Sequence, residues 1–310
     1  MAPSRRDLLA LGAVAPLLPV APGRAAGAWR AAAPMPSART EIAGALVGRL
    51  VVVAGGYHGE RETQIFDPAA KSWRVGAPLA APVHHAAAAA FQGGLVLAGG
   101  FDPGWRPLAA VRLYDPSRDA WTSLPDLPTP RGSPCAAVWR GRLHVVGGSG
   151  ADGRNTPAHE AFDPATGRWM ARAPLPTARD HFAMAEIGGR FVAAGGRRDG
   201  DPGRNLGVVE IYDPERDAWS RGRDMPTPRS GVAAAVLDGS VVVVGGESRE
   251  RTFADAEAYD PASDAWTALP PMATPRHGLV AAVFEGALYV VGGGPRPGAT
   301  RSDAVEVYRP

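Results

Sequence analysis

Residues 95–121, LVLAGGFDPGWRPLAAVRLYDPSRDAW, contain the pattern that decides the fold. A short apolar run ends in Gly99-Gly100, an aromatic-Asp-Pro turn follows at residues 114–116, and Trp121 stands six residues after Asp115. Apolar runs ended by glycines predict strands, and Asp-Pro favours a tight turn. The stretch therefore predicts a strand before the glycines and two further strands joined by the Asp-Pro turn.

The same pattern recurs along the whole chain. Gly-Gly pairs begin at residues 55, 99, 147, 195, 245 and 292, separated by 44, 48, 48, 50 and 47 residues. The first five pairs are each followed by an aromatic-Asp-Pro turn and by a tryptophan six residues after the aspartate: Trp73, Trp121, Trp169, Trp219 and Trp266. A fixed period of this length indicates a repeat architecture.

Two segments of each repeat behave differently. The residue ten positions after each tryptophan is Val83 once and arginine otherwise, and the next Gly-Gly pair begins 16 residues later without exception. All variation in length falls between Gly-Gly and the aspartate, where the spacings are 12, 16, 16, 18 and 15 residues. Because lengthening such a loop from 12 to 18 residues costs only about 0.4 kcal/mol, this segment marks a free surface.

This pattern resembles the kelch repeat, whose Gly-Gly pair, Tyr-Asp turn and tryptophan form one four-stranded blade of a β-propeller. The resemblance covers nearly all of the chain after residue 28. It implies an all-β fold: a six-bladed kelch β-propeller with four antiparallel strands in each blade. The sixth copy ends at residues 308–310 without a tryptophan, whereas Trp29 precedes Arg39 by the usual ten residues. We therefore expect the N-terminal strand to close the ring, which removes open sheet edges.

Residues 1–28 predict an export signal, leaving residues 29–310 as the propeller domain. Residues 4–9, SRRDLL, resemble a twin-arginine motif, and an apolar run and the small residues 26–28 follow it. The apolar run of about 14 residues is shorter than the roughly 20 that a membrane-spanning helix needs. We expect cleavage within residues 26–28 and a soluble periplasmic or secreted protein without a membrane anchor.

Composition narrows the choice of partner. The chain has 33 basic and 31 acidic residues, and without residues 1–28 it has 30 of each. A neutral chain lacks the basic surface typical of nucleic-acid binding. Cys135 is the single cysteine, so an internal disulfide and a cysteine-cluster metal site are both ruled out. We expect a monomer without cofactor or metal.

The candidate site is the mouth of the central channel, where the variable loops and the repeated arginine position should meet. The arginines at that position are Arg39, Arg131, Arg179, Arg229 and Arg276. They favour two interpretations. Guanidiniums around an opening would bind carboxylate or sulfate, whereas a residue repeated in most blades can equally belong to the architecture, bonded to backbone carbonyls.

Residues that depart from the repeat add further candidates. Strand alternation places Glu41, His85, Ser133 and His181 on the same side as the arginines, with His84, Asp180 and His277 on the other. Tyr57 and Trp105 lie in the variable loops. A tryptophan in a Pro-Gly-rich loop suits sugar stacking or anchoring of a partner, or packs on its own loop.

These features favour a binding or interaction protein that uses the loop face, with an acidic sugar or a protein as its ligand. Two enzyme alternatives follow from resemblance to other kelch proteins. A periplasmic sialic acid mutarotase needs a general acid and base, which Glu41, Asp180 and His181 would supply. Copper radical oxidases use tyrosines, histidines and a cysteine, to which Tyr57, His58 and Cys135 bear a superficial similarity, but their propeller has seven blades.

Overall fold

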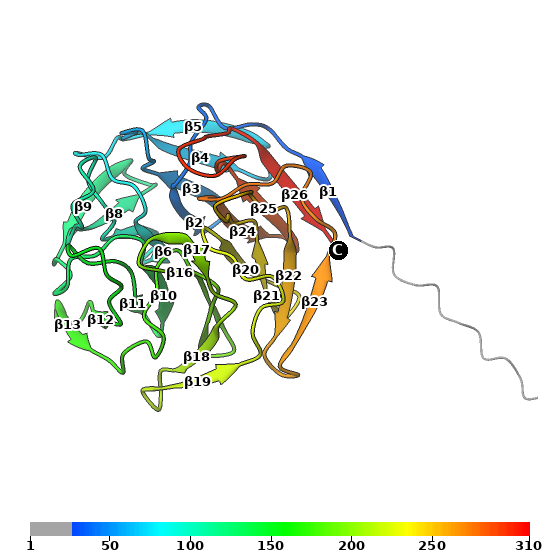
Figure 1. The fold of residues 1–310 in the computed structure, drawn as a ribbon. Helices are drawn as coiled ribbons and strands as arrows, with labels where there is room; N and C mark the ends of the chain where they lie inside the picture. Colours follow the sequence, from blue (N-terminus) through cyan, green and yellow to red (C-terminus); the bar gives the residue numbers. More distant parts are fainter. Residues whose placement is uncertain (1–26) are drawn as a thin grey trace, which may run out of the picture.

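The computed structural model describes residues 27–310, which form six four-stranded antiparallel sheets arranged in a ring (Figure 1). The predicted all-β fold, a six-bladed propeller with four strands per blade, is confirmed. The expected signal segment lies, up to residue 26, outside the described residues. Among those that are described, none belongs to a helix long and apolar enough to cross a membrane.

Each of blades 1 to 5 takes its strands from one continuous stretch of chain. Blades 1 to 3 consist of β2 (Ala43–Val47), β3 (Leu50–Ala54), β4 (Thr63–Asp67) and β5 (Ser72–Gly76); β6 (Ala87–Phe91), β7 (Gly94–Ala98), β8 (Val111–Asp115) and β9 (Ala120–Leu124); and β10 (Cys135–Trp139), β11 (Arg142–Val146), β12 (His159–Asp163) and β13 (Arg168–Ala171). Blades 4 and 5 consist of β14 (Ala183–Ile187), β15 (Arg190–Ala194), β18 (Val209–Asp213) and β19 (Ala218–Gly222); and β20 (Ala233–Leu237), β21 (Ser240–Val244), β22 (Ala256–Asp260) and β23 (Ala265–Leu269).

The sixth blade joins the two ends of the chain. It contains β24 (Val280–Phe284), β25 (Ala287–Val291), β26 (Val305–Arg309) and the N-terminal strand β1 (Ala28–Ala31). β1 runs antiparallel to β26 with Trp29 opposite Tyr308, so the predicted closure of the ring is confirmed. An additional hairpin, β16 (Arg197–Arg198) and β17 (Asp201–Asn205), lies in the loop of blade 4 that joins its second and third strands.

The position of a strand in its blade determines its burial. The first strands of all six blades contact one another in sequence around the channel, and β24 contacts β2 to complete the circle. Second strands such as β3 are covered by neighbouring blades on both faces, which explains their continuous apolar sequence. The outermost strands, such as β5, are largely exposed.

Contacts between blades hold the ring together. One core cluster joins Val53 and Phe66 of blade 1 to Tyr289 and Val291 of blade 6, so the core lies between sheets. Each repeated tryptophan donates its indole N–H to the preceding blade, as Trp121 does to the Ala77 carbonyl at 3.0 Å. The repeated tryptophan is therefore a residue of the blade interface.

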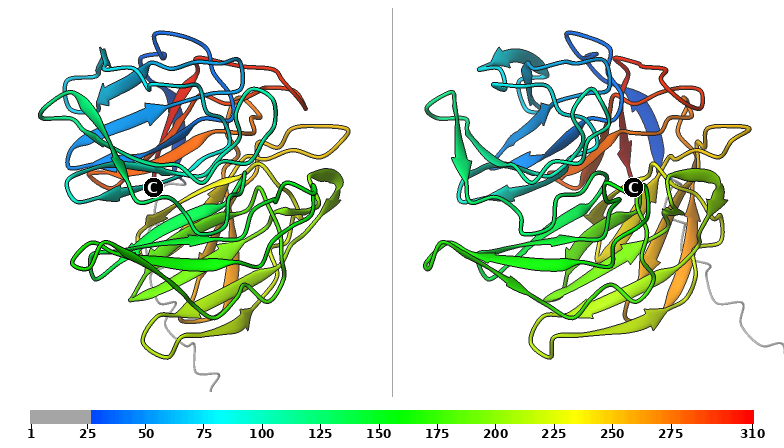
Figure 2. Two further views of the ribbon diagram at one scale, coloured as in Figure 1. Left: turned by 90° about the vertical axis from the view of Figure 1, so that its left-hand side faces the viewer. Right: turned by 60° about the vertical axis from the view of Figure 1, so that its left-hand side comes forward.

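All loops that join second to third strands emerge on one face of the ring. In the side views the β16–β17 hairpin and the loops near residues 250 and 298 extend from the same side (Figure 2). Each Gly-Gly pair lies at the base of one such loop. Gly99 has a φ of 65°, and a Cβ there would stand 2.5 Å from the Arg131 carbonyl, so glycine is required where neighbouring blades meet.

Two histidines buried in blade 3 make stability depend on pH. His144 on β11 contacts His159 on β12 at 2.9 Å, and His159 faces the Ala173 carbonyl at 3.1 Å. Burial lowers the pKa of His144 to about 3 and that of His159 to about 4. Below pH 6.5 the unfolded chain takes up protons that the folded chain does not, so this part of the stability is lost as pH falls from 6.5 towards 4.

We predict that the free energy of unfolding decreases by about 2 kcal/mol for each of these histidines between pH 7 and pH 5. Urea titrations at the two pH values measure the decrease. The double variant His144→Leu/His159→Leu should show a smaller decrease than the wild type. Equal decreases in both proteins would show that these histidines are not the source.

Candidate functional site

Six residues in the left-handed backbone conformation surround the channel on the loop face. They follow the repeated arginine position by two residues and have φ values between 51° and 66°: Glu41, His85, Ser133, His181, Gly231 and Gly278. Five backbone hydrogen bonds join neighbours in this set, each from the amide of one residue to the carbonyl of the one before it, as from Ser133 to His85 at 2.8 Å. The circle closes through the residue after Glu41, because the Ile42 amide donates to the Gly278 carbonyl at 3.4 Å. We call these six residues the mouth ring. They line a cavity of about 90 Å³.

The alternation expected at these positions is not what the structure shows. Glu41 and His85 were expected on the same side as the arginines, yet their side chains line the channel mouth while the arginines point into the blade. The first strand begins only afterwards, at Ala43 in blade 1. Because the ring residue is left-handed and precedes the strand, strand alternation does not apply there.

The five repeated arginines lie inside the blades. The side chains of Arg39, Arg131, Arg179, Arg229 and Arg276 expose none of their surface. Their guanidiniums donate to backbone carbonyls near the end of the second strand, such as Arg131 to Val145 at 2.9 Å and Arg276 to Gly292 at 2.7 Å. Of the two interpretations left open by the sequence, the geometry favours the architectural one, because no guanidinium of the set reaches the mouth.

Each of these arginines also has an acidic partner. Arg131 pairs with Glu160 at 2.9 Å and Arg276 with Glu306 at 3.1 Å, on the third strand of the same blade. Arg179 and Arg229 pair likewise with Glu210 and Glu257. These pairs had a mark in the sequence, because each glutamate stands three residues before the aspartate of the Asp-Pro turn, or before Arg309 in the last repeat. Blade 2 has Val83 at the arginine position and Arg112 at the glutamate position. Both residues of the ion pair are therefore replaced in the same blade.

A polar cluster fills one side of the mouth, centred on Arg197 from the β16–β17 hairpin. Arg197 donates to Glu247 Oε1 at 2.8 Å and to His181 Nε2 at 2.7 Å, and it lies 3.4 Å from Asp180 Oδ1. Burial opposes ionisation of Asp180, but the adjacent His181 and Arg197 outweigh it and hold its pKa at about 2. Arg197 and Glu247 occupy equivalent repeat positions, directly after a Gly-Gly pair.

A group of rings around His84 and His85 lies beside the mouth, next to His181. His84 Nδ1 faces His85 Nδ1 at 2.5 Å, and His85 Nε2 lies 3.1 Å from Glu41 Oε2. Burial is the main reason why the pKa of His85 lies well below its usual range, and the neighbouring His181, His84 and Arg197 lower it further. His85 is therefore a neutral imidazole at neutral pH. The mouth thus presents neutral rings and carboxylates in place of the expected array of cations.

Trp105 and Tyr57 complete this wall. The Trp105 ring centroid lies 5.7 Å from that of Tyr57 and 5.3 Å from that of His85, yet 49% of Trp105 is exposed. Trp105 has a φ of 60°, a strained conformation for a bulky residue. The turn is held by Asp102, whose carboxylate accepts hydrogen bonds from the amides of Gly104 and Arg106 at 2.8 and 2.9 Å.

The groups considered for catalysis are engaged in other contacts. His181 Nδ1 lies 2.5 Å from Asp180 Oδ1, as in a general base, but Arg197 occupies its Nε2. Cys135 donates to the Phe182 carbonyl at 2.8 Å, and burial raises the pKa of its thiol to about 12. Tyr57 packs against histidines and Trp105. The mutarotase and copper-oxidase alternatives stay predictions.

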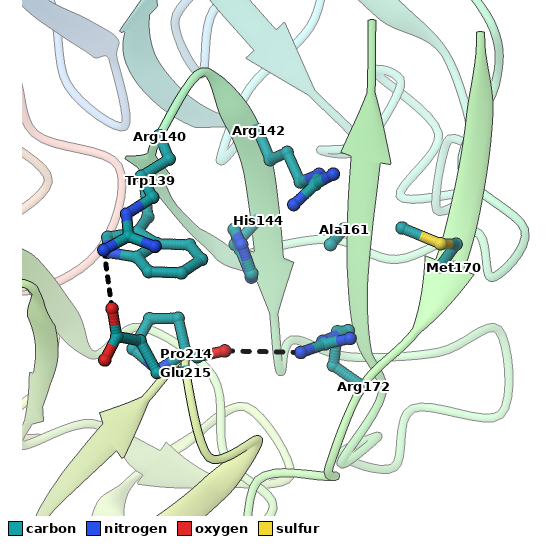
Figure 3. Close-up of a pocket in the computed structure, with 9 residues that line it drawn as sticks. All are labelled: Trp139, Arg140, Arg142, His144, Ala161, Met170, Arg172, Pro214 and Glu215. Atoms are coloured by element: carbon teal, nitrogen blue, oxygen red, sulfur yellow. Dashed lines mark hydrogen bonds and ion pairs between the residues drawn. The ribbon is translucent and has the colours of Figure 1, made fainter. Parts of the chain in front are cut away.

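A larger cavity, of about 350 Å³, opens between blades 3 and 4 beside the short turns (Figure 3). Trp139, His144 and three arginines line it. Two of these arginines are paired, Arg140 with Glu215 at 2.6 Å and Arg142 with Asp163 at 3.0 Å. None of the residues predicted from the sequence lies in it, and its cationic groups already have partners, so we place the candidate site at the mouth.

Replacing Arg229 tests the architectural role of the repeated arginine. We predict that Arg229→Met destabilises the protein by about 3–5 kcal/mol, because the buried Glu257 carboxylate loses its partner. The double variant Arg229→Met/Glu257→Gln should recover much of this loss, and the exposed-residue control Arg30→Met should match the wild type in urea unfolding. An Arg229→Met protein of unchanged stability but altered ligand affinity would instead identify Arg229 as a binding residue.

Comparisons with known proteins agree with this architecture. The family model described as "KLHDC2/KLHL20/DRC7 Kelch-repeats domain" matches residues 125–293, and the Kelch motif model matches residues 82–128. No curated protein matches. A solved structure titled "Structure of YjhT" superimposes with a TM-score of 0.79 at 17% sequence identity, covering 88% of this chain and 95% of that one.

At that identity the structural match establishes the fold alone. The family model, in contrast, spans more than half of the chain. Kelch propellers are typically scaffolds for binding or interaction. The chain belongs to the kelch-repeat family.

Proposed function

We propose that this protein is exported and binds a neutral carbohydrate at the channel mouth. The observation that carries the proposal is the half-exposed indole of Trp105, held beside the polar mouth ring. Sugar rings stack on aromatic faces while their hydroxyls bond to nearby polar groups. The indole lies beside the cavity of the mouth ring, since its ring centroid is 5.3 Å from that of His85, which lines the cavity.

The indole is fixed in place before any ligand arrives. The Asp102 turn holds Trp105, and Tyr57 and His84 pack against its ring at centroid distances of 5.7 and 4.8 Å. A side chain that is already ordered loses little conformational entropy on binding. Strain at an exposed tryptophan is typical of a functional position, which favours recognition over local packing as its role.

Charge at the mouth favours a neutral ligand over the acidic sugar expected from the sequence. That expectation rested on five arginines, all of which are buried and paired. Around the mouth ring, the carboxylates of Glu41, Asp180 and Glu247 surround a single guanidinium, Arg197, which is bonded to two of them. Hydroxyl groups donate hydrogen bonds to carboxylates, whereas a carboxylate ligand would be repelled.

Export is inferred from residues 1–28 alone. The Arg5-Arg6 pair, the apolar run after it and the small residues at 26–28 favour transport of the folded protein. A ligand site formed by six blades requires the complete ring, which suits export after folding. We place the protein in the periplasm or outside the cell.

Calorimetric titration of the chain from residue 27, kept in EDTA, with neutral and acidic sugars tests the binding proposal. We predict saturable binding of a neutral sugar and at least a tenfold loss of affinity in Trp105→Ala, equivalent to about 1.4 kcal/mol. Met170→Ala is the matched control, because Met170 is also exposed, on the outer strand β13.

The other outcomes contradict the proposal in distinct ways. Binding of acidic sugars but not of neutral ones would show that the ligand is an anionic sugar, as expected from the sequence. Turnover of a bound sugar would make the protein an enzyme. A screen without any sugar binding would leave the exposed indole as an anchor for a protein partner.

A further inference from the structure

His277 presents a buried, uncommitted nitrogen to two carboxylates. Its Nδ1 donates a hydrogen bond to the Gly294 carbonyl at 3.0 Å. Its Nε2 faces Glu41 Oε1, 3.4 Å away, and Glu247 Oε2, 3.5 Å away. The His277 side chain is 1% exposed, and those of Glu41 and Glu247 are 11% and 6% exposed. The imidazole nitrogen and the two carboxylate oxygens thus face one another in a space of low exposure, where Glu247 Oε2 also accepts a hydrogen bond from the Gly298 amide at 3.2 Å.

The distances between these three groups match ligands around an ion better than a hydrogen bond. A charge-assisted N–H···O bond measures about 2.7–2.9 Å. Tetrahedral ligands bonded at about 2.0–2.1 Å to a zinc ion stand about 3.3–3.4 Å apart. The separations of 3.4 and 3.5 Å from His277 Nε2 fall near the second range, and all three donor atoms lie within 4.8 Å of one another.

The surrounding groups hold each donor in position. The His277 ring is oriented by the Gly294 carbonyl, a contact typical of metal-binding histidines. Arg197 holds the second oxygen of Glu247 at 2.8 Å. Gly278 leaves room for the Glu41 carboxylate, since a Cβ there would stand 2.7 Å from Glu41 Oε1. The ligands are therefore preorganised before an ion binds.

Charge also favours a divalent cation. The carboxylates of Glu41, Asp180 and Glu247 lie around one guanidinium, that of Arg197, which pairs with Asp180 and Glu247. Three acidic groups around one guanidinium leave an excess of acidic groups, and burying such groups without a partner is costly. One divalent ion between Glu41, Glu247 and His277 balances them.

A neighbouring triad is a poorer site. Glu41, His85 and His181 also place donor atoms within 4.8 Å of one another. However, Asp180 occupies Nδ1 of His181 at 2.5 Å and Arg197 occupies its Nε2 at 2.7 Å. His181 therefore has no nitrogen left for a metal, and a guanidinium stands where the ion would be.

We propose that Glu41, Glu247 and His277 bind one divalent transition-metal ion, best zinc, at the channel mouth. Two carboxylates and one imidazole suit zinc, and a three-ligand set leaves a fourth position open. The site brings together ligands from blades 1, 5 and 6, which explains why no metal-binding spacing exists in the sequence. The inference concerns metal binding and does not depend on whether a sugar binds.

Titration of EDTA-treated, buffer-exchanged protein with ZnCl₂ and CoCl₂, without sugar, tests the site. Calorimetry should give one ion per chain, and cobalt should produce the strong visible absorption of a tetrahedral complex. His277→Ala should abolish stoichiometric binding, and Glu247→Gln should weaken it at least tenfold. His58→Ala, which removes an exposed histidine of the same face, should bind one ion as the wild type does. His181→Gln should still bind one ion, because His181 supplies none of the three ligands.

Thermal unfolding of each variant checks that it is folded. If His277→Ala does not fold, Glu247→Gln, which keeps the shape of the side chain, tests the site in its place. The proposal fails if the wild type binds no ion or if His277→Ala and Glu247→Gln bind as tightly as the wild type. Loss of binding in His181→Gln alone would move the ion to the neighbouring triad. Because sugar titrations are done in EDTA, their failure and the failure of this site are distinguishable.

Discussion

The structure depends on a buried guanidinium at the start of the innermost strand of nearly every blade. In blade 5, Arg229 reaches across the sheet to Glu257 on the third strand and to the Gly245 carbonyl at the end of the second. One side chain thus fixes three strands at the loop face. A left-handed residue follows two positions later, and its carbonyl or amide bonds to the equivalent residue of the next blade. The repeated arginines thus stabilise the blades, and the side chains of the mouth ring are the ones that line the channel opening.

The mouth ring is regular in its backbone and irregular in its side chains. Six equivalent positions carry glutamate, serine, two histidines and two glycines. The two glycines leave space, and Gly278 gives that space to the Glu41 carboxylate. Loops of unequal length then add what the ring lacks: a guanidinium from the β16–β17 hairpin and an indole from the Asp102 turn. A repeated scaffold therefore supports a group of side chains without symmetry.

Much of the architecture could be predicted from spacing, because each repeat position has one structural task. The position of Trp29 relative to Arg39 was enough to predict the strand pair of β1 and β26. The arrangement of side chains in the candidate site could not be predicted in the same way. The partner of Arg131 is Glu160, 29 residues away, and the left-handed turn at Glu41 and His85 overrides strand alternation. Gly231 and Gly278 occupy the same repeat position as Glu41 and His85, and glycine there was the one indication in the sequence that this position has a positive φ. Glu41 of blade 1 and His277 of blade 6 meet only through the closed ring, so no spacing in the sequence marks their proximity.

The mouth ring is a rigid circle held by the blades, and the candidate site is built on it. Amide hydrogen exchange of the free protein, resolved by residue, measures this rigidity. We predict that the amides of Ser133, His181, Gly231 and Gly278 exchange only through global unfolding, although they border an open cavity, because each donates to the carbonyl of the preceding ring member. Exchange of these amides within minutes, as in the exposed loops, would show that the mouth is mobile and that the ring is not a rigid base for the site.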